Sequence, residues 1–475
     1  MPEAATTLTH HAFYDEPWLR RARTPLLIFV ISAIVFTVFA GPRAKAPSPN
    51  NHFVYLADSY LHGTLEMRED PPHGNDWASY DTLTLASGDV YEGVWLDRRE
   101  RRFRALDDAV YVFDRAELRG MQTDRTYYVS FPPMPAVLMM PFVAVMGFDL
   151  NDVLFTIAFA AANMALFYVL MRRLSLGGLS RLNDAENLWM TVLFGFGTNH
   201  LWCSVQGAVW FTALIIGVTF TLLYLLASID AKHPFLAGLA LGCAFATRTP
   251  LLFTVVVFAA FFFFPGGRLR RDFGARFWRD GLLFVAAPLV IGLALLYANY
   301  LRFDHLSEFG HSYLANGQIA RIRDYGLFNV HFVSRNLAAM FALTPTLLPE
   351  APWVQVSKHG LALWVTTPAL LTLFVPRYAD DAASKLWLRT CAAAVLICAT
   401  LHVMYQNTGW VQFGFRFSLD YTVYLCVILA LARERLGVGF KVLLVLGILV
   451  NAFGAVTFDR MHQHYADFLI EAAPL

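Results

Sequence analysis

Three side chains near residue 60 have the types and the spacing of a small acid–base site. Tyr55, Asp58 and His62 are three and four positions apart, so a short helix would carry them on one face. A carboxylate held beside histidines can accept a proton from a hydroxyl group, which makes Asp58 a candidate general base and Tyr55 a candidate substrate contact. His52 and His62 could assist this base or could only hydrogen-bond within the segment. Asp58 could equally be a solvated residue of an interfacial helix, and composition alone does not choose between these interpretations.

Three arginines and two further polar residues could contact an anionic or polar substrate. The arginines are Arg248, Arg302 and Arg416, and the planar fork of arginine donates two parallel hydrogen bonds to a phosphate. An arginine between apolar spans, such as Arg248, is costly unless it is paired or lines a cavity. The alternatives are snorkelling to the headgroups for Arg248 and interfacial anchoring for Arg302. Glu308 and His311 are candidate lining residues of an acceptor or lipid groove, with simple solvation as the alternative.

The composition indicates that membrane helices position these residues. Of the 475 residues, 57% are hydrophobic and only 15% are charged, whereas soluble domains contain about 45–50% apolar and about 25% charged residues. This excludes a soluble enzyme, a disordered protein and a disulfide-stapled secreted domain. The five cysteines have no CxxC spacing, and no Walker A or dinucleotide-binding motif is present, so the sequence predicts no metal site and no cofactor. With a net charge of +1, nothing predicts a nucleic-acid partner.

Apolar runs of about 20 residues, the length that crosses a bilayer, predict an all-α polytopic membrane protein with about 11 transmembrane helices. The predicted spans are 25–41, 151–171, 187–205, 208–228, 234–247, 249–265, 281–300, 361–376, 387–407, 419–433 and 439–457. With this count the basic residues of every short loop fall on one side, as the positive-inside rule requires, and the N-terminus is cytoplasmic. The count takes 133–148 as an interfacial helix and takes 234–247 and 249–265 as two spans. Changing either assignment would break the charge pattern.

This topology divides the chain into membrane segments and outer loops. The predicted segments are a cytoplasmic tail (1–24), the first transmembrane helix (25–41), a first outer loop (42–150), further transmembrane helices (151–300), a second outer loop (301–360), the last transmembrane helices (361–457) and an outer tail (458–475). Alternating residues and turn signals in 80–118 predict a small β insert in the first outer loop, accompanied by juxtamembrane helices. A cleavable signal peptide is the alternative interpretation of 1–41. The candidate site residues then gather on the non-cytoplasmic side.

Several motifs resemble those of a known superfamily. They are NHFVYLADSYLHG (51–63), YYVSFPPMPAVLMMPF (127–142), ATRTP (246–250), YANYLRFDHLSEFGHSY (297–313) and GWVQFGFRFSLDY (409–421). They resemble polytopic glycosyltransferases of the GT-C fold, the superfamily of protein mannosyltransferases and lipid A aminoarabinose transferases, and in particular its uncharacterised bacterial members. The resemblance implies a GT-C-like fold, a polyprenyl-phosphate-linked sugar as donor, and Asp58 as the catalytic base. Asp304 stands where bacterial relatives often have Gly, and no acidic pair follows the first span, which argues against a metal-dependent variant.

The sequence therefore predicts an integral-membrane glycosyltransferase, a hexosyl- or pentosyltransferase. The enzyme would lie among membrane lipids and use a polyprenyl-phosphate-linked sugar as its donor. It would transfer the sugar to a glycan, lipid or protein acceptor at the periplasmic or extracellular face of a bacterial inner membrane. A transporter or flippase of lipid-linked or small substrates is the alternative, although it should show paired broken helices, mid-span polar clusters and an internal repeat. A third class is a non-catalytic membrane assembly protein, with the β insert as its docking module.

Overall fold

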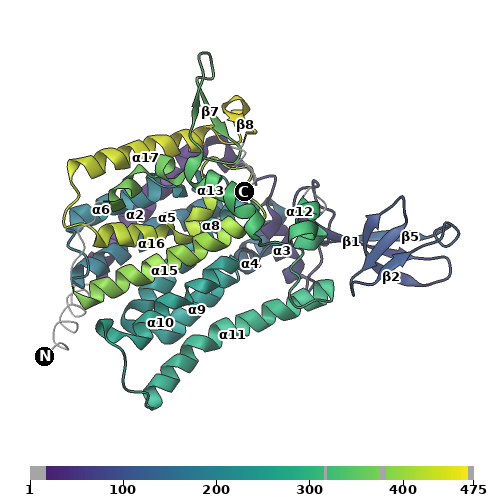
Figure 1. Cartoon of the computed structure of the whole chain (residues 1–475), viewed down its shortest axis with the longest axis horizontal. Helices are drawn as coiled ribbons and strands as arrows, with labels where there is room; N and C mark the ends of the chain where they lie inside the picture. The colour runs from purple at the N-terminus through teal and green to yellow at the C-terminus, as the bar shows by residue number, and fades with distance from the viewer. Residues whose placement is uncertain (1–17, 315–317, 375–380, 469–475) are drawn as a thin grey trace. The chain divides into compact units, whose positions relative to one another are not determined.

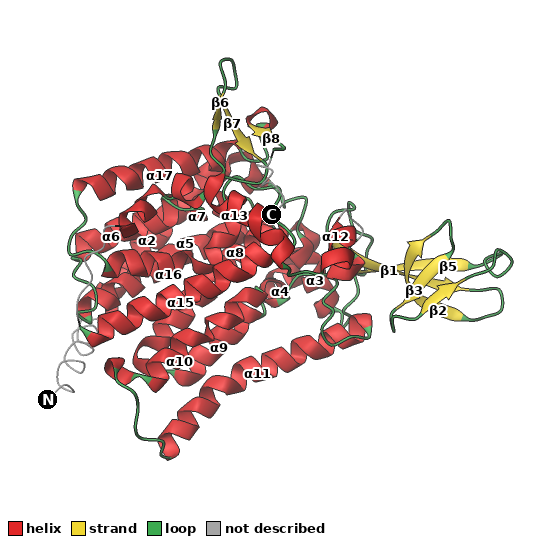
Figure 2. Ribbon diagram, in the orientation of Figure 1, coloured by secondary structure: helices red, strands yellow, loops and turns green. Residues whose placement is uncertain are grey.

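The computed structural model describes residues 18–314, 318–374 and 381–468, and the chain divides into two compact units (Figure 1). The first, here called the helical unit, comprises Met1–Ser48, Asn151–Pro288 and Phe328–Leu475. The second, here called the mixed unit, comprises Pro49–Leu150 and Leu289–Leu327. Helices dominate the helical unit, whereas a sheet makes up much of the mixed unit (Figure 2). Most of the predicted cytoplasmic tail and the end of the predicted outer tail lie outside the described residues.

The helical unit is built from long helices and from shorter, broken ones. Its α-helices are α2 (Trp18–Ala40), α5 (Asp152–Leu176), α6 (Asp184–Phe196), α7 (His200–Ser204), α8 (Ala208–Ser228), α9 (Pro234–Phe245), α10 (Val256–Phe263), the first part of α11 (Ala275–Phe303), α13 (Val333–Leu337), α14 (Leu363–Thr366), α15 (Ala382–Met404), α16 (Leu419–Leu431) and α17 (Val438–Thr457). Short 3-10 or π turns are η1 (Gly41–Lys45), η3 (Ile229–Ala231), η4 (Thr249–Val255), η5 (Pro265–Gly267), η7 (Val330–Phe332), η8 (Ala338–Ala342), η9 (Pro368–Phe374), η10 (Arg416–Ser418) and η11 (His462–His464). A small sheet of order β6-β7-β8 joins Thr346–Leu347, Val354–Ser357 and Tyr465–Ala466.

Six helices of the described residues are long and apolar enough to cross a membrane. They are Ala22–Lys45, Asp152–Leu176, Ala208–Ala231, Ala275–Phe303, Ala382–Met404 and Val438–Thr457. The prediction of an all-α protein with about 11 transmembrane helices is therefore wrong in the number of long helices, and the two sheets go beyond the small predicted insert. A GT-C-like architecture of eleven spans is not what the chain shows.

The remaining predicted spans are either interrupted or too short to count among the long helices. The predicted span 187–205 is divided between α6 and α7, and Gly197 follows the last residue of α6. The run 249–265 begins as the 3-10 turn η4, and its α-helix α10 has only 8 residues. α16, at 13 residues, is about 20 Å long, against about 30 Å for the hydrocarbon core. Hydropathy averages reported the apolar composition of these runs but not the breaks inside them.

Polar contacts at the ends of α5 and α8 fix the point at which the chain leaves the helical unit. The Asp152 carboxylate accepts hydrogen bonds from the backbone N–H of Ser48 (2.7 Å), from the Ser48 hydroxyl (2.6 Å) and from the backbone N–H of Ala208 (2.8 Å).

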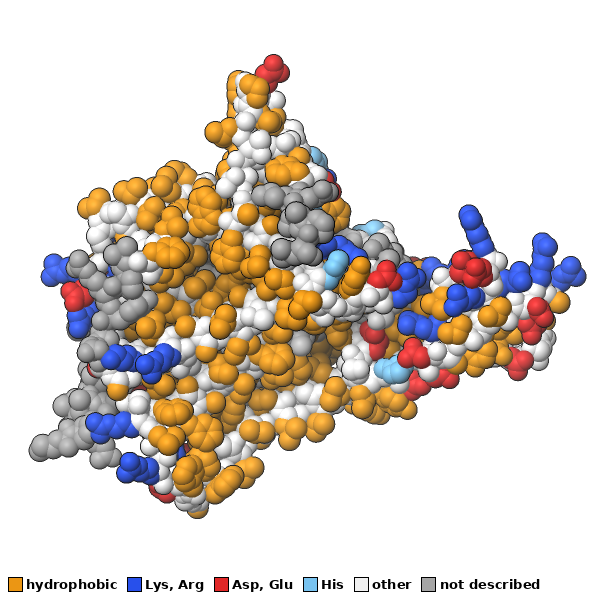
Figure 3. Space-filling view, viewed as in Figure 1, with side chains coloured by type: hydrophobic (Ala, Val, Ile, Leu, Met, Phe, Trp, Pro, Cys, Tyr) orange, Lys and Arg blue, Asp and Glu red, His pale blue; other side chains and the backbone are white. Residues whose placement is uncertain are grey.

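Lys and Arg side chains gather at one end of the helical unit, whereas hydrophobic side chains cover the visible face of its helices (Figure 3). Near the end of α5, Arg172 lies 3.8 Å from Asp184 at the start of α6.

The mixed unit holds a five-stranded antiparallel sheet of order β4-β3-β2-β1-β5. Its elements are α3 (His52–Leu61), β1 (Trp77–Thr84), β2 (Val90–Asp97), β3 (Arg102–Ala105), β4 (Val110–Val112), β5 (Gln122–Val129), α4 (Met134–Met146), η2 (Gly147–Asp149), the end of α11, η6 (His311–Tyr313) and α12 (Gln318–Tyr325). The predicted β insert is present, but it extends beyond 80–118 because β1 pairs with β5 along its whole length, from Trp77↔Val129 to Thr84↔Gln122. The first four residues of β5 are exposed, so this strand lacks the alternation that revealed β2.

Candidate functional site

Helix α3 presents Asp58 on its partly open face. Phe53, Val54 and Leu56 are among its buried residues, and the helix packs against α4. Tyr55 and Asp58 are only partly buried. Burial of the apolar face therefore fixes the rotation of α3 and leaves the carboxylate on the accessible side.

The Asp58 carboxylate is covered by two basic side chains. The Nη1 of Arg68 donates to Oδ2 (3.3 Å), and the Nδ1 of His62 lies 3.5 Å from Oδ1. Arg68 Nη1 also lies 2.8 Å from the Nδ1 of His62. The Asp58 side chain is 13% exposed, whereas Arg68 and His62 are 45% and 48% exposed. The carboxylate is thus partly shielded from solvent by two half-exposed side chains.

The structure places His52 and Tyr55 in an aromatic cluster. His52 is fully buried, stacks on Trp77 with ring centroids 3.7 Å apart, and directs Nε2 to the backbone carbonyl of Asn75 (2.9 Å). Burial lowers the pKa of His52 to about 4, so the ring is neutral near pH 7. Tyr55 meets Trp77 edge-on and packs against Phe148, with centroid distances of 5.6 and 4.7 Å. Burial raises the pKa of Tyr55. Of the two histidines predicted to assist Asp58, His62 is the one beside it, whereas His52 is a packing residue of this unit.

Arg302 uses its guanidinium to join the end of α11 to the sheet. Its Nη1 donates to the carbonyl of Val129 (3.0 Å), its Nη2 donates to Oδ1 of Asn299 (2.7 Å) and its Nε donates to the carbonyl of Ala298 (3.2 Å). All three donor nitrogens therefore have protein acceptors. These contacts give Arg302 a structural role between α11 and the sheet, which is neither the predicted phosphate contact nor the interfacial anchoring.

Glu308 and His311 shape the turn after α11. Glu308 Oε1 accepts from the backbone N–H of Gly310 (2.6 Å). The ring of His311 packs on Phe309, with centroids 4.7 Å apart, and burial lowers the pKa of His311 to about 4. Gly310 has φ +100 and lies so close to Ala78 that a Cβ would stand 3.0 Å from the Cβ of Ala78. This turn is therefore held by the Glu308 side chain and by close packing of Gly310 against β1.

A buried ionic cluster in the helical unit contains Arg248. Its Nε and Nη2 donate to Asp420 Oδ1 (2.5 Å) and Oδ2 (2.8 Å), so the pair is bidentate. His402 Nε2 lies 2.9 Å from the same Oδ2. The Asp420 side chain is 1% exposed. His402 lies in the last turn of α15, Asp420 lies in the first turn of α16, and Arg248 lies between α9 and η4. Two helices and one connecting segment therefore contribute to this group, here called the buried ionic cluster.

Arg416 lies in the same unit, in the turn η10 that precedes α16. Its backbone N–H donates to Oε1 of Gln412 (2.9 Å). The guanidinium carbon lies 5.2 Å from the ring centre of Phe211 and 5.6 Å from that of Phe417. The guanidinium carbon of Arg248 lies 5.6 Å from the same Phe417 ring. Arg248 and Arg416 are therefore brought to one aromatic side chain, although they are far apart in sequence.

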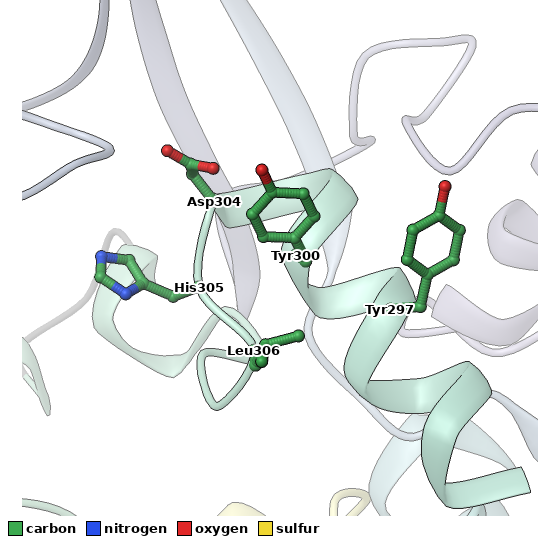
Figure 4. Close-up of a pocket in the computed structure, with 5 residues that line it drawn as sticks. All are labelled: Tyr297, Tyr300, Asp304, His305 and Leu306. Carbon is green, nitrogen blue, oxygen red and sulfur yellow. The ribbon is translucent and has the colours of Figure 1, made fainter.

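A hollow of about 590 Å³ lies at the end of α11 in the mixed unit (Figure 4). It is lined by Tyr297, Tyr300, Asp304, His305 and Leu306. The two tyrosine rings project from the same side of α11 (Figure 4), as their spacing of three positions requires. None of these five residues is among the predicted site residues.

Sequence reasoning missed Arg68, His402 and Asp420. Arg68 reaches Asp58 from a loop, so the helical periodicity that linked Asp58 to His62 gave no signal for it. Asp420 did carry a signal, because an arginine inside an apolar region needs a counter-charge and Asp420 is the acidic residue of the predicted span 419–433. Within the described ranges, no group of three or more His, Cys, Asp or Glu side chains is placed to hold a metal ion.

Comparisons with protein-family models, with curated proteins and with solved structures gave no match to this chain.

Proposed function

We propose that the chain is an integral-membrane glycosyltransferase that uses a polyprenyl-phosphate-linked sugar, with Asp58 as the general base. The observation that carries the proposal is the arrangement around Asp58, a partly buried carboxylate with a histidine and an arginine at its two oxygens. Such a group can take the proton of an acceptor hydroxyl, while the cation beside it can stabilise the charge that develops on a leaving phosphate. The motif resemblance around residues 51–63 supports the same role.

The proposed reaction is a displacement at the anomeric carbon of the donor sugar. The acceptor oxygen forms a bond to that carbon, and the bond from the carbon to the phosphate oxygen breaks with its electron pair going to the phosphate. The acceptor proton passes to the Asp58 carboxylate and from there to solvent. This step needs no cofactor, and the acceptor is a hydroxyl group of a glycan, lipid or protein.

We further propose a bacterial inner membrane with the N-terminus in the cytoplasm and the active face outside. The support is the gathering of Lys and Arg at one end of the helical unit (Figure 3), because basic residues favour the cytoplasmic side. A reporter fused after Arg271 tests this orientation. Activity of a reporter that works only in the periplasm would contradict it.

The proposed function is tested by transfer from a panel of polyprenyl-phosphate sugars to acceptors, catalysed by the purified protein in nanodiscs. We expect the wild-type chain to release polyprenyl phosphate and Asp58→Asn to lose turnover while still binding the donor. Asp97→Asn is the matched control, because Asp97 is an acidic residue of the same unit that caps a turn through the backbone N–H of Arg99 (2.7 Å). Full transfer by Asp58→Asn would contradict the assignment of the base.

A second candidate function is transport or flipping of a lipid-linked or small substrate. The buried ionic cluster favours it, because ionisable residues inside membrane helices often mark ion or proton pathways. Asp420→Asn in proteoliposomes tests this candidate. Substrate movement that depends on Asp420 and persists in Asp58→Asn would favour transport over transfer.

A further inference from the structure

Arg68 holds Asp58 with only part of its guanidinium. The contact to the carboxylate is a single one, from Nη1 at 3.3 Å, rather than the paired contact of a bidentate ion pair. In the described part of the chain, no hydrogen bond is found from the Nε or Nη2 of Arg68. Two of its three nitrogens therefore keep donors for another acceptor.

Arg302, the arginine of the mixed unit that the sequence predicted as a phosphate ligand, already uses each of its three nitrogens in a protein contact. It donates from all three of its nitrogens to Val129, Asn299 and Ala298. Moving Arg302 to a ligand would break contacts between α11 and the sheet. Moving Arg68 breaks its single contact with Asp58 and its contacts with the His62 ring. Because the Arg68 side chain is 45% exposed, loss of this ion pair changes an equilibrium constant by about 5-fold or less.

We propose that Arg68 exchanges partners during the reaction, from the Asp58 carboxylate to the phosphate of the polyprenyl-phosphate donor. This inference rests on the proposed function. At rest, Arg68 covers the carboxylate. When the donor binds, the guanidinium turns to the phosphate, with which its free nitrogens form paired hydrogen bonds, and the carboxylate is uncovered for the acceptor hydroxyl.

The exchange predicts the sign of the coupling energy between Asp58 and Arg68 in a double-mutant cycle of phosphate binding. Because Asp58 and the phosphate compete for Arg68, Asp58→Asn frees the arginine and tightens the binding of a phosphate ligand. Without Arg68, only the repulsion between carboxylate and phosphate is relieved. If Arg68 instead stayed on Asp58, it would screen that repulsion, and Asp58→Asn would tighten binding more in the absence of Arg68 than in its presence.

The experiment measures the binding of a short-chain polyprenyl phosphate to the full chain in nanodiscs. The variants are Asp58→Asn, Arg68→Ala, their combination and Arg68→Lys. We expect Asp58→Asn to tighten binding about 5-fold with Arg68 present and less than about 2-fold in Arg68→Ala. Equal or greater tightening in Arg68→Ala would overturn the proposal. Polyprenol without phosphate is expected to show no coupling between the two residues, and the same coupling with polyprenol would also overturn it.

A matched control and a parallel activity assay separate the possible failures. Arg98→Ala is the control, since Arg98 is also exposed and also donates to a carboxylate of the mixed unit, that of Asp81 at 3.0 Å; we expect its ligand binding to equal that of the wild type. If the wild-type chain transfers sugar but Asp58→Asn tightens phosphate binding more without Arg68 than with it, only the proposed exchange is wrong. If no donor of the panel supports transfer, the proposed function fails whatever the sign of the cycle.

Discussion

Replacing one member of the buried ionic cluster should destabilise the helical unit strongly. Removing one partner of a buried ion pair typically costs about 3–5 kcal/mol, because the other charge stays buried without compensation. Asp420 is 1% exposed and Arg248 is 15% exposed. Arg248→Met therefore leaves the more deeply buried charge with only His402 beside it, at 2.9 Å, and should cost about 5 kcal/mol. Asp420→Asn leaves the less buried charge and should cost about 3 kcal/mol.

The double variant Arg248→Met with Asp420→Asn removes both charges of the pair. Its loss in free energy of unfolding should be much smaller than the sum of the losses in the two single variants. We expect a coupling energy of at least about 3 kcal/mol. The assay is thermal or denaturant unfolding in detergent, where each kcal/mol moves the midpoint by roughly 2 °C for a chain of this size. Arg181→Ala and Glu434→Ala form the control pair, because this ion pair is half exposed and should couple by less than about 1 kcal/mol. Additive effects of Arg248→Met and Asp420→Asn would refute the reasoning.

Three further predictions concern the mixed unit. Burial lowers the pKa of His52 from 6.5 to about 4, so on acidification the unfolded chain takes up this proton before the folded chain does. The free energy of unfolding is therefore highest above pH 6.5 and falls by about 3 kcal/mol as the pH drops towards 4. Unfolding midpoints at pH 7 and pH 4.5 should show a smaller loss in His52→Gln, and an unchanged loss would contradict this. Arg302→Ala should lower the free energy of unfolding by about 1–3 kcal/mol, because it removes hydrogen bonds to Val129 and Asn299, and should change the KM for the donor less. A large rise in KM at unchanged stability would instead indicate that Arg302 binds the donor phosphate. Gly310→Ala should destabilise by about 1–3 kcal/mol, because φ is +100 and the added Cβ would stand 3.0 Å from Ala78, whereas Gly437→Ala, which meets no atom within 4 Å, should be nearly neutral.

The long helices could be predicted from the sequence, but the broken ones could not. The predicted span 208–228 coincides with α8 (Ala208–Ser228), and 439–457 nearly coincides with α17 (Val438–Thr457). Both are uninterrupted apolar runs. By contrast, 361–376 contains the short helix α14 and the 3-10 turn η9, and Pro368, at the start of η9, cannot donate the backbone hydrogen bond that would continue α14.

The candidate site was predictable only where its residues share one helix. The three- and four-residue spacing placed His62 beside Asp58, and a contact of 3.5 Å joins them. Arg68 comes from a loop, so only the folded chain brings it to the carboxylate. The need of Arg248 for a partner followed from its apolar surroundings. The choice of Asp420, 172 positions away, required the fold that brings the start of α16 to the segment after α9.

The most direct test of the central claim is the rate of sugar transfer by Asp58→Asn compared with the wild-type chain, measured with saturating donor. If Asp58 takes the acceptor proton, kcat should fall by about 10²-fold or more while donor binding is retained or tightened. An unchanged kcat in a folded Asp58→Asn protein would contradict the account.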